Sequence, residues 1–263
     1  SMPLSGFVWE EQGNIIGNVS LIPYHRSRQK YYLIANVAVH PNQRRRGIGR
    51  HLTQAAIEYA RGKKSSGIWL HVRDDNPGAI NLYRELGFQT RACRSSWRVN
   101  LNKLASPPSP VRDITRRYKR DWSYQLQLLR RAYPEDLDWY QPLPISSLRS
   151  GFLYSVERFL FGDEIRHWVA RKGKEMETAL SWQPSPVGYP DRLWCAIPQG
   201  NAGEALKSLL LCARHDLSYR RTTLALDYPA GEYEEDIQAA GFTLQRRLMW
   251  MQWTETLSPD GRM

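Results

Sequence analysis

Apolar and polar residues alternate along the first forty residues in the manner of β-strands. "FVWEEQGNIIGNVSLIPY" reads as two strands joined by a turn at residues 12–14, and "YYLIANVAVH" as a third strand rich in Val, Ile and Tyr. The spacing then becomes helical in "RHLTQAAIEYARGKK", where Leu52, Ala56 and Tyr59 share one face. A strand "GIWLHV", a helix "AINLYRELGF" and a strand pair around "QTRACRSSWRVNL" follow. The order β-β-β-α-β-α-β predicts an α/β fold.

A segment rich in Ser and Pro, "LASPPSPVRD", predicts an extended connector and a domain boundary near residue 107. Beyond it, "DWSYQLQLLRRAY" and "ISSLRSGFLYSVERFLFG" have helical patterns. The pattern of the first half then returns as a hairpin "HWVARKGKEMETALSW", a strand "RLWCAI", a helix "AGEALKSLLLCARH", a strand "TTLALDY", a helix "EYEEDIQAAGF" and a strand "TLQRRLMWMQW".

The returning pattern is an internal repeat. A shift of 154 residues superposes Gly49 on Gly203, Leu70 on Leu224 and Gly87-Phe88 on Gly241-Phe242 without a gap. We therefore expect two domains, residues 1–106 and 107–263. The second copy has a mostly helical stretch ahead of its hairpin, whereas the first begins almost at its hairpin after a Ser-Met pair typical of an expression remnant. The first domain is thus expected to be incomplete at its N-terminus.

The positive charge of the chain is concentrated in its first half. Residues 1–104 carry 16 Lys and Arg against 6 Asp and Glu, while the remaining residues carry 21 against 20, which accounts for the net charge of +11. Such a basic half predicts an anionic partner: a nucleic acid, a phosphorylated cofactor or an acidic surface. Charge alone does not choose among them.

Three cysteines, Cys93, Cys195 and Cys212, are odd in number and lack metal-ligand spacing, so neither a disulfide framework nor a metal site is expected. A reducing compartment is the simplest context, and we expect a cytoplasmic protein. No window approaches the roughly 18 apolar residues of a membrane helix. The opening "SMPLSGFVWEEQGN" has no apolar core of a signal peptide.

One candidate for anion binding is "HPNQRRRGIGRHL", which lies between a predicted strand and a predicted helix. Amides at a helix N-terminus and the positive end of the helix dipole attract anions. Gly47 and Gly49 would let a phosphate approach the backbone, and the arginines would add charge-assisted hydrogen bonds. Taken alone, this segment could also be a solvated, basic turn. The segment matches neither a P-loop nor a dinucleotide-binding fingerprint, because it lacks the third glycine of the latter.

The order and spacing of two segments resemble a known family. Arg44-x-x-Gly47-x-Gly49, between strand and helix, resembles the pyrophosphate-binding motif of the GCN5-related N-acetyltransferase (GNAT) family, and "LHVRDDNPGAINLYRELGF" resembles that family's second signature. The resemblance covers residues 7–104 closely and 111–253 only through the repeat. It implies two tandem GNAT-like domains of the α/β (α+β) class, each with a mixed, mostly antiparallel twisted sheet flanked by helices.

The resemblance also implies acetyl-CoA as the cofactor. In this family the loop amides hold the pyrophosphate, with side chains at residues 43 and 44 in reach. The preceding strand pairs its backbone with the pantetheine in a gap beside "GIWLHV". An Asn at residue 76 holds the pantetheine or the helix start. The implied binding residues are Val37, Val39, Gln43, Arg44, Arg46, Gly47, Ile48, Gly49, Arg50, Asn76 and Tyr83.

Two residues are candidates for catalysis. The resemblance places Tyr83 opposite the thioester sulfur, where its hydroxyl would act as the general acid that protonates the leaving thiolate. The alternative is a half-buried aromatic residue that packs with Leu82 and Leu86. His71 stands where relatives resembling the ribosomal-protein N-terminal acetyltransferases carry a Glu that acts as a base through water. Imidazole accepts protons near neutral pH, but a histidine on a strand is often only structural.

His40 and Asn36 are weaker candidates for the base.

When the shift of 154 residues is applied to the motif positions, the second copy keeps the residues that form the fold but lacks the polar ones. Arg44 maps to Pro198, Gly47 to Asn201, His71 to Ala225, Asn76 to Ala230 and Tyr83 to Ile237. The second copy is therefore predicted to be catalytically degenerate, with Trp168, Trp182, Trp194 and Trp250 in a core or an interface.

These features predict an N-acetyltransferase that transfers an acetyl group from acetyl-CoA to a primary amine of a small molecule, peptide or protein. A non-catalytic acyl-CoA-binding or regulatory module is the alternative. Nucleic-acid binding is not expected, because no helix-turn-helix, zinc-finger or RNA-binding aromatic motif is evident. No membrane partner is expected, and a homodimer stays open.

Overall fold

The computed structural model describes residues 5–101, 113–149, 165–220 and 222–255. Contacts divide the chain into two compact units. Unit 1 contains the chain up to Cys93 and again from Leu248 onward, and unit 2 contains Arg94–Arg247. No helix in these described stretches is long and apolar enough to cross a membrane.

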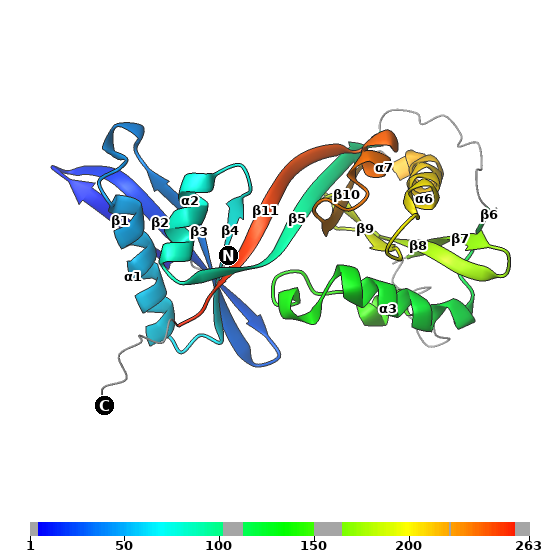
Figure 1. Ribbon diagram of the computed structural model, residues 1–263, viewed down its shortest axis with the longest axis horizontal. Helices are drawn as coiled ribbons and strands as arrows, with labels where there is room; N and C mark the ends of the chain where they lie inside the picture. The colour runs from blue at the N-terminus through cyan, green and yellow to red at the C-terminus, as the bar shows by residue number, and fades with distance from the viewer. Residues whose placement is uncertain (1–4, 102–112, 150–164, 221, 256–263) are drawn as a thin grey trace. The chain divides into compact units, whose positions relative to one another are not determined.

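Unit 1 is a mixed sheet with two helices on one face (Figure 1). The strand order is β1-β2-β3-β4-β11, antiparallel throughout except for the parallel pair β3 and β4. Its elements are β1 (Ser5–Glu11), β2 (Asn14–Arg26), β3 (Gln29–Val39), the short 3-10 helix η1 (Pro41–Gln43), α1 (Ile48–Gly62), β4 (Gly67–Arg73), α2 (Pro77–Glu85), the start of β5 (Phe88–Asn100) and the end of β11 (Thr243–Trp253).

The apolar face of helix α1 packs into the core of unit 1. Leu52 and Ala56 are buried there against alternate strand residues such as Ile34 and Leu70. A Cβ atom at Gly17 would lie 3.0 Å from the Leu52 side chain, so this glycine permits the close approach of α1 to β2.

Unit 2 repeats this arrangement, with strand order β5-β10-β9-β8-β7-β6 and one parallel pair, β9 and β10. In Figure 1, α6 and α7 lie on one face of this sheet and α3 on the other. Its elements are β6 (Asp113–Thr115), η2 (Lys119–Asp121), α3 (Trp122–Ala132), η3 (Glu135–Leu137), α4 (Ile145–Leu148), β7 (Arg166–Lys172), β8 (Glu175–Gln183), β9 (Asp191–Ala196), α6 (Gly203–Asp216), η4 (Ser218–Arg220), β10 (Thr223–Pro229) and α7 (Glu234–Ala239).

The element order confirms the tandem fold expected from the sequence. Apart from the 3-10 helices, the seven strands and α-helices from β1 to β5 recur in the same order from β7 to β11. Both copies end their second helix at a glycine in the left-handed region, Gly87 at φ +93° and Gly241 at φ +85°, as a helix C-terminus favours. Trp168, Trp182 and Trp194 lie in the core of unit 2.

The units do not follow the linear boundary expected at residue 106. The first half of the long strand β5 belongs to unit 1, while Arg94–Asn100 pairs with β10 of unit 2. Conversely, β11 begins in unit 2, and Leu248–Gln252 pairs with β4 of unit 1. Each copy therefore completes its sheet with a strand from the other copy, which a boundary drawn along the sequence does not capture.

Two other expectations differ from the structure or lie outside it. The strand pair expected around residues 89–101 is one continuous strand, β5, because its second half finds its partner in β10 rather than in its own first half. Of the helix expected over 145–162, the structure describes α4, and residues 150–164 lie outside the described part. The expected connector, 104–113, also lies outside it apart from its last residue.

Candidate acyl-CoA site

The glycine loop after β3 leads directly into α1. Gly47 is the N-cap residue at φ +78°, a conformation that favours glycine, and α1 begins at Ile48. Gly47 supplies no capping side chain, and the first turn of α1 contains no acidic residue. Because the first amides of a helix have no partner within it, their N–H groups are available to an anion. The structure therefore places a helix N-terminus at the segment predicted to bind an anion, and the binding itself stays a prediction.

Arg46 is held beside this loop by residues from two other segments. Its two Nη atoms bond the carboxylate of Glu11, at 2.9 and 3.0 Å, and one of them also donates to Gln43. Glu11 accepts a further bond from Trp9 Nε1 at 3.0 Å. The bonds from Arg46 and then Trp9 lower the pKa of Glu11. This contact on Arg46 from strand β1 was not expected from the sequence.

Arg44 and Arg50 of the same segment contact different elements. Arg44 Nε donates to the carbonyl oxygen of Val39 at 3.3 Å, which ties the loop to the end of β3. Arg50 forms an ion pair with Glu85 at the end of α2. Two guanidinium nitrogens of Arg44 are outside that bond, so its side chain can both hold β3 and reach an anion.

Strands β3 and β4 separate beside this loop, as expected. Their last paired residues are Ile34 and Leu70, although β3 continues to Val39. Asn36, at φ +53°, marks an irregularity in the pairing of β3 with β2, where a bulge re-aims the strand. The side chains of Val37 and Val39 pack against the core of unit 1.

Helix α2, which carries Asn76 at its N-cap and Tyr83 within it, lies beside the glycine loop of unit 1. Asn76 is its N-cap, and its Oδ1 accepts a hydrogen bond from the amide of Ala79 at 3.1 Å. A Cβ atom at Gly49 would lie 3.8 Å from both Leu82 of α2 and Val39 of β3, so the loop, strand end and helix converge. Burial raises the pKa of the Tyr83 hydroxyl, which keeps it protonated at neutral pH.

His71 lies on β4 one residue beyond the last pair with β3. Its ring stacks on Trp250 of β11, with centroids 4.2 Å apart, and the two residues are paired in the ladder between these strands. Trp250 was expected in a core or an interface of the second copy, but it contributes to unit 1. The two weaker candidates for the base each have a hydrogen bond to a neighbouring residue. His40 accepts from the amide of Asn42 at 3.4 Å, and Asn36 donates to Ser20 Oγ at 3.4 Å.

In unit 2, side chains from α7 and its N-cap contact the corresponding helix start and the loop before it. The carboxylate of Asp236, from α7, lies against Gly203 at the start of α6. The Tyr233 hydroxyl donates to the carbonyl oxygens of Pro198 and Gly200 in the loop before it. Ile237, which replaces Tyr83, is fully buried. These contacts agree with a degenerate second copy.

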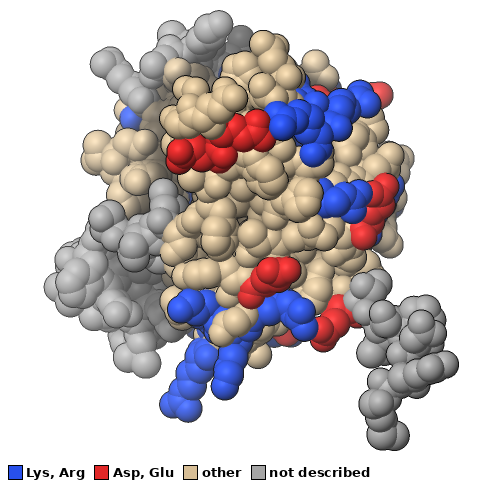
Figure 2. All heavy atoms as spheres, turned by 90° about the vertical axis from the view of Figure 1, so that its left-hand side faces the viewer, with Lys and Arg blue, Asp and Glu red and all other residues tan. Residues whose placement is uncertain are grey.

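Basic side chains on unit 1 are divided into groups. Figure 2 shows one face, on which blue clusters of Lys and Arg each lie beside red Asp or Glu side chains. This distribution agrees with the ion pairs Arg46–Glu11, Arg50–Glu85, Arg61–Glu255 and Arg73–Asp75. The face shown in Figure 2 therefore presents no continuous basic stripe of the kind that follows a nucleic-acid backbone.

Comparisons with known proteins agree with this geometry. Residues 2–88 match the model of the acetyltransferase (GNAT) family. The N-alpha-acetyltransferase RimI of Mycobacterium tuberculosis is 35% identical over 77 residues, which are 29% of this chain and 47% of that protein. The ribosomal protein bS18-alanine N-acetyltransferase of Escherichia coli K12 is 37% identical over 62 residues, 24% of this chain and 42% of that protein. The chain thus spans less than half the length of these curated relatives.

A solved structure shows the fold over a larger part of the chain. The GCN5-related N-acetyltransferase of Sphaerobacter thermophilus superposes with a TM-score of 0.54 at 14% identity, covering 91% of this chain and 77% of that one. At this identity the likeness establishes the fold alone. Residues 2–88 therefore match the GNAT acetyltransferase family, and the likeness to this structure, with the recurrence of the element order in unit 2, gives the chain a tandem GNAT fold.

Proposed function

We propose that this chain is an acetyl-CoA-dependent N-acetyltransferase in which unit 1 holds the cofactor and acetylates a primary amine. The observation that carries the proposal is the start of α1, where a left-handed Gly47, a first turn without acids and three flanking arginines leave a positive helix end open to an anion. The GNAT match over residues 2–88 supports the pyrophosphate of acetyl-CoA as that anion.

The fit of the remaining residues supports this assignment. Amides from Arg46 to Arg50 would hold the pyrophosphate, with Arg44 and the Gln43 side chain beside it. The backbone of Val37 and Val39, at the point where β3 has left β4, would pair with the pantetheine as an added strand. Asn76 acts through the start of α2, which it caps.

Acetyl-CoA supplies an activated thioester, and the chain must supply the proton transfers. Tyr83 would donate a proton to the departing thiolate sulfur, a role suited to a hydroxyl that burial keeps protonated. His71 would accept the proton of the attacking amine, through water, from its place on β4. The amine is that of a small molecule, peptide or protein. A peptide with an N-terminal alanine is a rational first acceptor, because one relative is a ribosomal-protein alanine acetyltransferase.

The cofactor site is tested by adding negative charge at each end of α1. Gly49→Glu places a carboxylate in the first turn, where a Cβ atom has ordinary contacts of 3.8 Å. Acetyl-CoA binding, measured by titration calorimetry, should weaken about a hundredfold or more through like-charge repulsion. Gly62→Glu makes the same charge change at the far end of the helix, in open space, and should bind normally.

Equal affinities for the two variants would refute the assignment of the site. Normal binding by the wild type without turnover of any amine in a panel of small amines and peptides would instead support the non-catalytic acyl-CoA-binding module. Loss of binding in both variants, with unchanged thermal unfolding, would place the cofactor elsewhere.

A further inference from the structure

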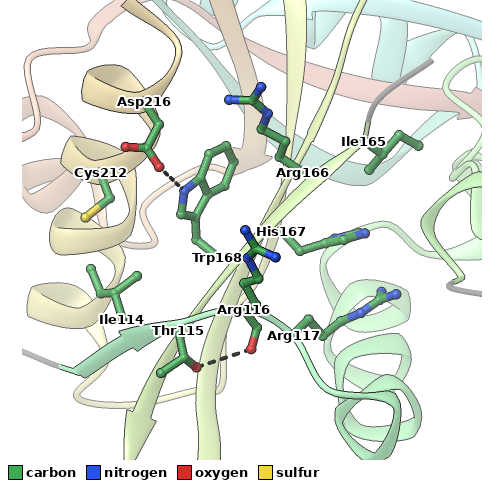
Figure 3. Close-up of a pocket in the computed structure, with 10 residues that line it drawn as sticks. All are labelled: Ile114, Thr115, Arg116, Arg117, Ile165, Arg166, His167, Trp168, Cys212 and Asp216. Atoms are coloured by element: carbon green, nitrogen blue, oxygen red, sulfur yellow. Dashed lines mark hydrogen bonds between the residues drawn. The ribbon is translucent and has the colours of Figure 1, made fainter. Parts of the chain in front are cut away.

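Unit 2 contains a cavity of about 870 Å³ far along the chain from the residues assigned to acetyl-CoA. It lies between β6, the segment that follows it, the start of β7 and the C-terminal end of α6 (Figure 3). Ligand sites in proteins commonly have volumes of about 300–1,000 Å³. The cavity is therefore large enough to admit a small organic molecule.

This cavity is distinct from the degenerate counterpart of the cofactor site. In the second copy that counterpart is the start of α6 at Gly203, where Asp236 lies. The cavity instead contacts Cys212 and Asp216 in the last turns of the same helix. A ligand bound here would not use the pyrophosphate-binding features of the GNAT fold.

Three arginines line the cavity, and two of them are fixed by neighbouring groups. Arg117 Nη1 donates to Gln125 Oε1 at 2.9 Å and to the carbonyl oxygen of Leu148 at 2.6 Å. The guanidinium of Arg166 lies 5.8 Å from the ring centroid of Trp182. These contacts fix the two guanidinium groups at the wall of the cavity.

The third arginine is available to a ligand. Within the described parts of the chain, the Arg116 guanidinium forms no hydrogen bond or ion pair, and Figure 3 shows it extended between Trp168 and His167. Asp216 is the one carboxylate among the described lining residues, and it accepts a hydrogen bond from Trp168 Nε1 at 2.8 Å. The described lining residues therefore include three arginines and one carboxylate.

Apolar surface lies beside these charges. Trp168 and Ile165 are buried residues of the unit 2 core, and Ile114 on β6 packs partly against the same core. A ligand that satisfies both features carries an anionic head, a carboxylate or phosphate, joined to a compact apolar group. We propose that this cavity binds a small organic anion of this kind, with Arg116 as the residue that contacts its head.

The test is a titration of the full chain with phenyl phosphate and, separately, with 3-phenylpropionate, followed by calorimetry. Saturable binding of at least one probe is expected, and the tighter probe identifies the head as phosphate or carboxylate. Arg116→Gln should weaken this binding about tenfold. Arg192→Gln, an exposed arginine on β9 outside the cavity, removes the same charge and should have no effect.

A second variant gives an effect of opposite sign, which loss of folding would not produce. Asp216→Asn keeps an oxygen that accepts from Trp168 but removes the carboxylate charge, so it should tighten binding of the probe. Absence of saturable binding to the wild type, or equal losses in Arg116→Gln and Arg192→Gln, would overturn the proposal. Acetyl-CoA binding should be unchanged in all three variants, so the two sites are tested independently.

Discussion

Tyr83 is a core residue of unit 1 and the general acid of the proposed mechanism. Its ring packs edge-on against Phe88, with centroids 6.0 Å apart, within the core of unit 1. Tyr83→Phe keeps this packing and removes only the hydroxyl. If the hydroxyl is the general acid, the maximal turnover rate should fall about a hundredfold while the affinity for acetyl-CoA is unchanged. Steady-state kinetics and calorimetry separate these two quantities.

Tyr59→Phe is the matched control for this change. Tyr59 lies on α1 and packs edge-on against Phe7 and Tyr32, with no place in the proposed chemistry. Its turnover rate should equal that of the wild type. An undiminished rate in Tyr83→Phe would remove Tyr83 from the mechanism and leave it as a core residue.

At the scale of the element, the end of β11 is an integral part of unit 1. Met251 is fully buried in the core of that unit, and Trp253 Nε1 donates to the carbonyl oxygen of Leu86 at 2.9 Å. Met251→Ala should destabilise the chain by about 2–5 kcal/mol. Hydrogen exchange should show the loss of protection in β4, which pairs with this strand.

Gln252→Ala, one residue along and on the other side of the strand, should have a much smaller effect because Gln252 is only half-buried. If Met251→Ala instead loosened unit 2 and left β4 protected, the assignment of this segment to unit 1 would be contradicted.

Helix α7 is joined to β11 within unit 2 by an ion pair that should respond to pH. The hydrogen bond from Arg247 lowers the pKa of Glu234, and the amide of Gly231 also donates to this carboxylate at 3.0 Å. A lowered pKa stabilises the fold above the unfolded value of about 4.3, and this stabilisation is lost as the pH falls through the lower folded value. Glu234→Gln should therefore cost less than about 1 kcal/mol at pH 7.

The difference between wild type and Glu234→Gln in denaturant unfolding should shrink towards zero as the pH drops below about 4. A difference that stays constant from pH 7 to pH 3 would show that the carboxylate charge does not contribute. Glu175→Gln is the control, because Glu175 is an exposed residue of β8.

Local patterns in the sequence predicted the elements but not all of their partners. The alternation in "TLQRRLMWMQW" defined β11 to the residue, and glycines at 47 and 49 marked the start of α1. The exchange of β5 and β11 could not be predicted, because a long strand of alternating residues fits more than one neighbour. For the same reason the stacking of Trp250 on His71, far apart in the sequence, had no local signal.

For the whole molecule, the two copies share an element order but differ at the start of their first helix. Unit 1 presents a glycine-capped helix end flanked by arginines, whereas unit 2 places the Asp236 carboxylate against Gly203. Glu204 also lies in the first turn of α6, whereas the first turn of α1 contains no acidic residue. An anion approaching α6 would therefore meet acidic side chains where α1 offers arginines.

This difference predicts one acetyl-CoA per chain. Calorimetric titration of the wild type should give a stoichiometry of one, and Gly49→Glu, which blocks the start of α1, should leave no measurable binding at the same ligand concentrations. Because the Tyr233 hydroxyl bonds the loop carbonyls before α6, unit 2 also has no open loop to receive a pyrophosphate. A stoichiometry of two, or one site that persists unchanged in Gly49→Glu, would mean that the second copy binds acetyl-CoA.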